Sequence, residues 1–171
     1  HADRDADMAK QMFEHVATAW DINDDVLVNR LQWAARLHEI GLSISHENFH
    51  KHSSYLIEHS NLPGFSREEQ HALAVMIRGQ RKKFPKKYIK RLPDELQHAT
   101  ERLTVLLRLA MVFNRGRSEK TDTYVCLEVT KKALKLSLPK DWLKRHSLTE
   151  TDLAQEKEYL QAIGINLQVS G

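Results

Sequence analysis

The spacing of apolar residues changes once along this chain, and that change limits the fold more than any other feature. Through the first part, apolar residues recur every three or four positions, as at Met8, Met12 and Val16, which is the period of an amphipathic helix. In the last part they alternate with polar residues, as at Val125 and Leu127, which is the period of a strand. We therefore expect a mainly α-helical protein that ends in a small α+β unit.

Local capping and breaking signals divide the first part into helices. Asp24 is expected to cap the second helix, and Gly41 to end it in a left-handed conformation. A third helix is predicted over residues 47–59, and Ser66 opens a capping box for a fourth. A long helix with a wide apolar stripe should follow Pro93, which suits the centre of a helical bundle.

Two strands, a helix and a third strand are predicted in the last part. The second strand covers residues 134–138, Ser147 is expected to cap the helix, and the third strand covers 165–169. Such a small sheet has to be covered by its helix. We expect a helical domain over residues 1–118 and a small β-β-α-β domain over 119–171.

Positive charge is concentrated in one segment. The net charge of the chain is +3, and no Asp or Glu lies between residues 78 and 91. We call the cations of this stretch the basic segment: Arg78, Arg81, Lys82, Lys83, Lys86, Lys87, Lys90 and Arg91. Such a concentration favours a polyanionic partner, with a solvated basic loop as the alternative.

Composition excludes several classes of protein. With 41% hydrophobic and 29% charged residues, the chain is not expected to be disordered. The single cysteine, Cys126, cannot form an intrachain disulfide and favours a reducing compartment. No apolar run approaches the roughly 20 residues of a membrane span, and no signal peptide is visible. Because the chain begins at His1 without Met, we expect a fragment of a longer protein.

A histidine-rich stretch follows the second predicted helix. His38 and Glu39 are adjacent, and His46, His50 and His52 follow. Imidazole and carboxylate both suit divalent metals, but neighbouring side chains on a helix point about 100° apart. With 10 histidines in the chain, packed or surface histidines are the alternative to a metal site.

Longer motifs carry a family resemblance. They are RLQWAARLHEIG at residues 30–41, HKHSSYLI at 50–57, NLPGFS at 61–66 and LLRLA at 106–110, with Leu138-Pro139 and Trp142-Leu143 later. Over essentially its whole length the chain resembles the C-terminal region of the bacterial exopolyphosphatase/guanosine-pentaphosphate phosphatase family. The resemblance implies an HD-domain-like helical bundle followed by a small α+β domain.

The resemblance also implies where catalysis takes place. Full-length members have two N-terminal actin-like domains, which hold the Mg-dependent site that hydrolyses terminal phosphoanhydrides of polyphosphate or guanosine pentaphosphate. The glycines of this chain are isolated and form no phosphate-binding loop. We expect the catalytic domains to be absent here, and this chain to hold no cofactor and to be non-catalytic by itself.

An HD-type metal site would be degenerate in this chain. Metal-dependent HD phosphohydrolases use an early His, a His-Asp pair and a late Asp. The resemblance places His1 at the early position and His38 in the pair, but Glu39 replaces the Asp and Met111 replaces the late Asp. Because a thioether does not replace a hard carboxylate toward Mg or Mn, we expect a vestigial motif that includes His52 and no metal. An active HD nucleotide phosphohydrolase is the alternative.

The resemblance gives the basic segment a partner. C-terminal domains of the family help to hold polyphosphate and to form a homodimer, and binding a polyanion gains from counterion release. A family motif, Arg-x-His-Arg-Lys, is resembled by Arg78, Arg81, Lys82 and Lys83, and Gln80 takes its His position. Arg108, Arg115 and Arg117 could extend the track, or could be surface charges near a helix C-terminus.

Partners and location follow from the same resemblance. We expect polyphosphate or guanosine pentaphosphate, a second copy of the chain and the protein's own catalytic domains as partners. Guanosine pentaphosphate would link the protein to the stringent response. The expected location is cytoplasmic, with peripheral attachment to the inner membrane as an alternative. RNA binding is disfavoured, because Tyr124 is the one aromatic residue on the predicted strands.

Overall fold

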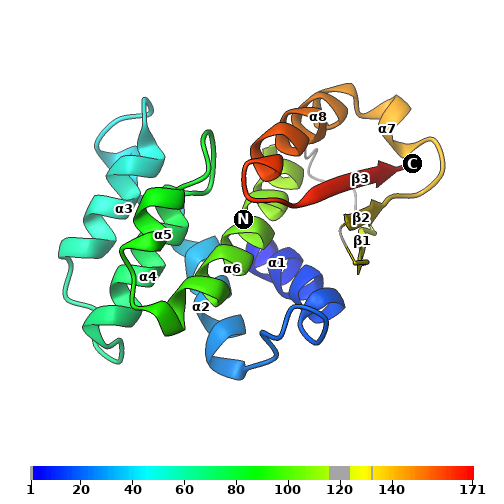
Figure 1. The fold of residues 1–171 in the computed structure, drawn as a ribbon. Helices are drawn as coiled ribbons and strands as arrows, with labels where there is room; N and C mark the ends of the chain where they lie inside the picture. The colour runs from blue at the N-terminus through cyan, green and yellow to red at the C-terminus, as the bar shows by residue number, and fades with distance from the viewer. Residues whose placement is uncertain (1, 116–123, 132) are drawn as a thin grey trace.

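The computed structural model describes residues 2–115, 124–131 and 133–171, with helices first and a small sheet last (Figure 1). The first part contains α1 (Ala2–Val16), α2 (Asp25–Leu37), the 3₁₀ helix η1 (Ile40–Ser43), α3 (Phe49–His59), α4 (Arg67–Arg78), α5 (Lys86–Lys90) and α6 (Asp94–Arg115). The second part contains β1 (Cys126–Val129), β2 (Ala133–Ser137), α7 (Trp142–Arg145), α8 (Ser147–Gln161) and β3 (Asn166–Ser170). The predicted mainly α fold with a small α+β part is confirmed. The predicted boundary at residue 118 lies outside the described residues.

Helix α6 is the centre of the molecule. It packs against α1, α2, α4 and α5 of the first part and against α8 of the second. From Leu103 to Phe113 every residue of α6 is buried, including the polar Thr104 and Arg108. A helix that is apolar nearly all round is one that neighbours enclose on every side. In Figure 1, α6 accordingly runs between the other helices and α8.

Gly41 does not have the predicted role. Helix α2 ends at Leu37, and Gly41 lies within η1 at a backbone angle that is not left-handed. A Cβ atom there would collide with the backbone N of Ser53 and the carbonyl O of Phe49. The glycine is therefore required because α3 approaches the backbone closely, and its N–H donates to Ser53 Oγ at 2.8 Å.

Two of the three predicted caps are confirmed. Asp24 accepts a hydrogen bond from the N–H two residues on at 2.8 Å, and Ser66 accepts one from the N–H three residues on at 3.1 Å. Ser147 is instead the first residue of α8, and His146 occupies the cap position without a side-chain cap bond. The His146 ring stacks on Trp142 of α7 with ring centroids 3.7 Å apart. Helix α7 was not predicted, and this stack fixes the direction in which the chain enters α8.

The sheet has the order β1-β2-β3. Strand β1 is antiparallel to β2 with Leu127 opposite Leu136, and β3 is parallel to β2 with Leu167 opposite Leu134. Helix α8 packs against β3, while α1 packs against β1, where His15 Nδ1 accepts from the N–H of Leu127 at 3.1 Å. Among the described residues, no helix is both long and apolar enough to span a membrane.

Candidate polyanion-binding site

The basic segment begins at the end of α4, crosses a loop and continues through α5. Its lysines and Arg91 are exposed, whereas Arg78 and Arg81 are half-buried. The lysines concerned are Lys82, Lys83, Lys86, Lys87 and Lys90. Within residues 2–115, 124–131 and 133–171, no ion pair joins the basic segment to a carboxylate. The segment therefore presents positive charge that the described carboxylates leave largely uncompensated.

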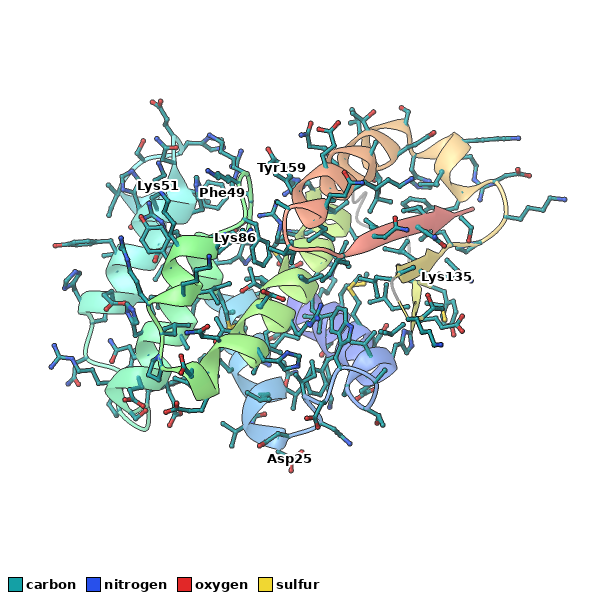
Figure 2. The ribbon with its side chains drawn as sticks, in the orientation of Figure 1. Asp25, Phe49, Lys51, Lys86, Lys135 and Tyr159 are labelled. Carbon is teal, nitrogen blue, oxygen red and sulfur yellow. The ribbon has the colours of Figure 1, made fainter. Side chains whose placement is uncertain are left out.

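Aromatic rings hold the arginines of the segment in place. The guanidinium carbon of Arg78 lies 4.3 Å from the centre of the Tyr88 ring, and that of Arg91 lies 5.4 Å from the same ring. Arg81 lies 5.0 Å from the ring centre of Phe49, which begins α3 (Figure 2). A guanidinium stacked on a ring keeps its charge and its N–H edge. These arginines remain able to bind oxyanions.

His50 of α3 lies buried in the electric field of the same cations. It is 4% exposed, and burial lowers the pKa of His50 to about 4, assisted by the charges of Arg81, Lys82, Lys51 and Arg78 in that order. Its Nδ1 is buried and has no hydrogen-bond partner among the described residues. The imidazole is therefore neutral at pH 7, and the positive potential around it adds to the effect of burial in opposing protonation.

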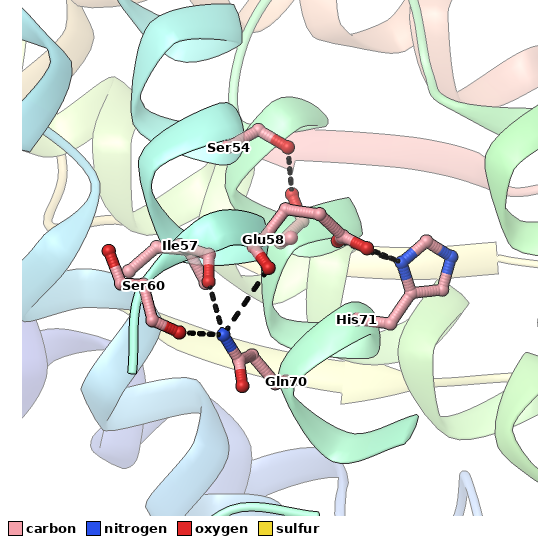
Figure 3. Close-up of polar contacts among 7 residues, drawn as sticks. Ser54, Ile57, Glu58, Ser60, Gln70 and His71 are labelled. Carbon is pink, nitrogen blue, oxygen red and sulfur yellow. Dashed lines mark hydrogen bonds and ion pairs between the residues drawn. The ribbon is translucent and has the colours of Figure 1, made fainter. Parts of the chain in front are cut away.

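Polar contacts join α3, which carries His50, to α4, which ends at Arg78 of the basic segment; Figure 3 shows these contacts. Gln70 Nε2 of α4 donates to the carbonyl oxygens of Ile57 at 2.7 Å and Ser60 at 2.6 Å. Ser54 Oγ of α3 donates to the carbonyl oxygen of Ala74 in α4 at 2.7 Å. These bonds satisfy backbone groups at the end of α3 and hold the two helices in one register.

Gln80 links the basic segment to the predicted HD remnant. It is 2% exposed, and its Nε2 donates to the carbonyl oxygen of His38 at 2.7 Å. His38 is buried, with Nδ1 2.6 Å from the carbonyl oxygen of Ala35 and Nε2 3.3 Å from Glu39 Oε1. Gln80, at the family's His position, is thus a structural link beneath the surface.

The other described residues of the predicted HD remnant do not come together as a metal site. His52 is half-buried on α3, Met111 is 3% exposed in the core, and His1 lies outside the described residues. Across the described ranges, no group of three or more His, Cys, Asp or Glu side chains is placed to hold a metal ion.

Arg108 does not lie on an exposed track, contrary to the expectation from the sequence. It is fully buried and forms a paired contact with Glu156 of α8, at 3.0 Å from Nε and 2.9 Å from Nη2. It also donates to the carbonyl oxygens of Gly79 at 2.8 Å and Lys82 at 2.6 Å. Its charge is already balanced, so Arg108 shapes the loop that carries the basic segment instead of extending its surface.

Arg115 is half-exposed and lies 3.5 Å from a carboxylate oxygen of Asp152 in α8. Its place in a polyanion track stays a prediction, weakened by that partner. Arg117 lies outside the described residues.

Some residues of the site carry no clear signal in the sequence. Two such residues are Phe49 and Lys51 of α3, which are labelled in Figure 2. They lie beside the basic segment because α3 packs there, and nothing in the local sequence indicates that contact. Glu156 has no local signal, because it meets Arg108 only through the fold, 48 positions away. A buried arginine within the apolar stripe of α6 is the one available clue that a distant carboxylate has to exist.

Comparison with known proteins gives consistent matches. The family model described as Ppx/GppA phosphatase, domain III, matches residues 1–157. A guanosine-5'-triphosphate,3'-diphosphate pyrophosphatase of Aeromonas hydrophila is 31% identical over 164 residues, which cover 96% of this chain and 33% of that protein. Proteins of the same name from Vibrio cholerae and Pseudoalteromonas translucida are 34% and 30% identical, over 88% and 99% of this chain and 30% and 34% of theirs. The chain spans about a third of the length of the curated relatives it matches.

Proposed function

The chain belongs to the Ppx/GppA phosphatase family, and from that premise we propose that it is the region of such a phosphatase that binds polyanions and forms a dimer. The whole protein would hydrolyse terminal phosphoanhydrides of polyphosphate or guanosine pentaphosphate. We assign that reaction and its Mg to the part of the protein outside this chain.

One observation carries the polyanion proposal: exposed lysines and half-buried arginines gather around the buried His50, and no described carboxylate forms an ion pair with them. A solvated basic loop would not require this arrangement. Here Arg78 and Arg81 rest on aromatic rings, and Arg108 fixes the loop between them. Polyphosphate carries about one charge per phosphate, so a fixed row of cations releases condensed counterions when it binds.

The test removes charge from the basic segment without disturbing its contacts. Lys82, Lys83, Lys87 and Lys90 are changed together to Gln, while Lys86 is kept because its Nζ donates to the carbonyl oxygen of Ala162 at 3.0 Å. The affinity of the chain for polyphosphate, measured by fluorescence anisotropy at several salt concentrations, should fall roughly tenfold or more. The slope of log affinity against log salt should flatten by up to about 3, at roughly 0.7 per lost contact.

A matched control changes the same amount of charge elsewhere. Lys10, Lys135, Lys140 and Lys157 are exposed and lie outside the basic segment. Their joint change to Gln should leave the affinity for polyphosphate within about twofold of the wild-type value. The loss of net charge is the same, but the electric field of the basic segment is intact. Equal losses in both variants would mean that net charge, and not this site, holds the polyanion.

Exposed apolar side chains support the dimer proposal. Leu42 and Ile44 of the η1 region are 40% and 54% exposed, and Trp33 and Tyr55 on the flanking helices are 44% and 61% exposed. Scattered exposed apolar residues are ordinary, but four on consecutive elements favour a protein contact.

Changing Leu42 and Ile44 to Glu should shift the chain from dimer to monomer in sedimentation velocity. Leu148→Glu, at a 75% exposed position on α8, is the control. A wild-type chain that stays monomeric at high concentration would end the dimer proposal.

A further inference from the structure

A separate cavity lies where the helical part meets the sheet, away from the basic segment, none of whose residues line it. Its volume is about 410 Å³, and its walls come from the turn after α1, from α6, from the turn between β1 and β2, and from the turn that leads into β3. Small-molecule sites usually enclose about 300–1,000 Å³ and often lie between structural units, so the size and place suit a small ligand.

The charge of the cavity wall has one sign. Arg102 and Lys131 line it, and no acidic side chain does so among the described residues. Arg102 lies with its guanidinium carbon 5.1 Å from the Trp20 ring, and its Nε is buried without a hydrogen-bond partner among the described residues. An unsatisfied buried donor on a charged group is costly and calls for a partner such as an anion or water.

Apolar side chains form another part of the wall, beside its polar groups. Leu134 of β2 and Ile165, just before β3, line the cavity and are 1% and 7% exposed, and Val129 lines it from β1. Thr130 adds a hydroxyl group beside Lys131. A ligand that fits both halves of this wall has an oxyanion at one end and a compact apolar body at the other.

We propose that this cavity binds a small organic oxyanion, with its charged group at Arg102 and Lys131 and its apolar body against Leu134 and Ile165. Its modest volume distinguishes it from the basic segment, because a long polymer does not fit within it. The proposal does not depend on polyanion binding. Because the walls come from both parts of the chain, occupancy stabilises their contact through mass action.

The test uses the whole 171-residue chain and four probes: phenyl phosphate, benzoate, benzyl alcohol and inorganic phosphate. Titrations followed by two-dimensional NMR should show saturable binding of phenyl phosphate or benzoate, with shifts at the Trp20 indole, Thr130 and Gly164, which line the cavity. The tighter of these two probes identifies the oxyanion as a phosphate ester or a carboxylate. Benzyl alcohol lacks the charge and inorganic phosphate lacks the body, so each should bind at least about tenfold more weakly.

Variants separate the site from the fold. Arg102→Gln should weaken binding about tenfold or more, and Lys131→Gln, at an exposed turn where folding is not at risk, by a few-fold. Arg67→Gln, at an exposed position at the start of α4, is the matched control and should leave binding unchanged. Bound probe should also raise the melting temperature of the wild-type chain but not of Arg102→Gln. The proposal is overturned if neither oxyanion binds saturably, if benzyl alcohol binds as tightly, or if Lys131→Gln and Arg102→Gln bind like the wild type.

Discussion

At the scale of single residues, His50 reports the potential of the whole basic segment. Burial and the cations Arg81, Lys82, Lys51 and Arg78 lower its pKa to about 4. An anion bound to those cations would offset their part of the shift, while burial would continue to oppose protonation. Polyanion binding should therefore raise the pKa of His50, though not to the ordinary value of 6.5.

The ring resonances of His50, followed by NMR from pH 7 to 3.5 with and without polyphosphate, test this prediction. The ring resonances of His146, in the small part of the chain, serve as a reference that polyphosphate should not change. If the pKa of His50 is the same with and without polyphosphate, the anion binds elsewhere.

The same lowered pKa has a consequence for stability. Between pH 6.5 and about 4 the unfolded chain protonates this histidine and the folded chain does not, so His50 makes the fold less stable as pH falls through that window. The contribution is at most roughly 3 kcal/mol. His50→Gln should flatten the pH dependence of the urea midpoint between these limits, because its side chain does not titrate. An unchanged pH dependence would mean that His50 has no part in it.

At the scale of elements, the pair Arg108–Glu156 joins α6, α8 and the loop of the basic segment. Lys82 in that loop has a left-handed backbone, with φ of 61°. Such a conformation costs an ordinary residue about 1 kcal/mol, and the bond from Arg108 to the Lys82 carbonyl oxygen offsets it. Helix α8 thus supplies, through Glu156, the charge that allows Arg108 to lie buried and to hold this loop in place.

Two variants separate stability from loop shape. Glu156→Gln leaves Arg108 buried without a counter-charge, and should lower the free energy of unfolding by about 3–5 kcal/mol. The double change Arg108→Met and Glu156→Met replaces the pair by apolar groups and should recover most of that loss. The double change also removes the donors to the carbonyl oxygens of Gly79 and Lys82. The affinity of the double variant for polyphosphate should therefore be lower than that of the wild type, even where its stability is recovered. A double variant that binds polyphosphate as well as the wild type would show that the pair has no role in the site.

Which elements could be predicted depended on how local their causes are. Helix and strand periods, and the caps at Asp24 and Ser66, arise from neighbouring residues and were predicted correctly. Gly41 and Ser147 were misjudged because contacts with α3 and α7 decide their conformations. The charge of the basic segment was visible in the sequence. Its link to His50 was not, because that link depends on how α3 packs against α4.

At the scale of the whole molecule, the small α+β part supports one face of the helical part. Arg108–Glu156 and the bond from Lys86 to the Ala162 carbonyl oxygen both connect the basic segment to α8. The anion cavity lies at a different junction, between α1, α6 and the sheet. Within the described part of the chain, these two cationic regions differ in shape: one is spread over a surface and the other is confined to a cavity. Both parts of the chain contribute residues to each region or to its support.

Above all, we propose that the exposed cations next to His50 form the surface that holds a polyanion. The most direct measurement is a backbone NMR titration of the chain with polyphosphate of defined length. We expect the amide signals of residues 78–91 and of the first turn of α3 to shift together and saturate. Shifts that are confined to other surfaces, with these signals unmoved, would contradict this proposal.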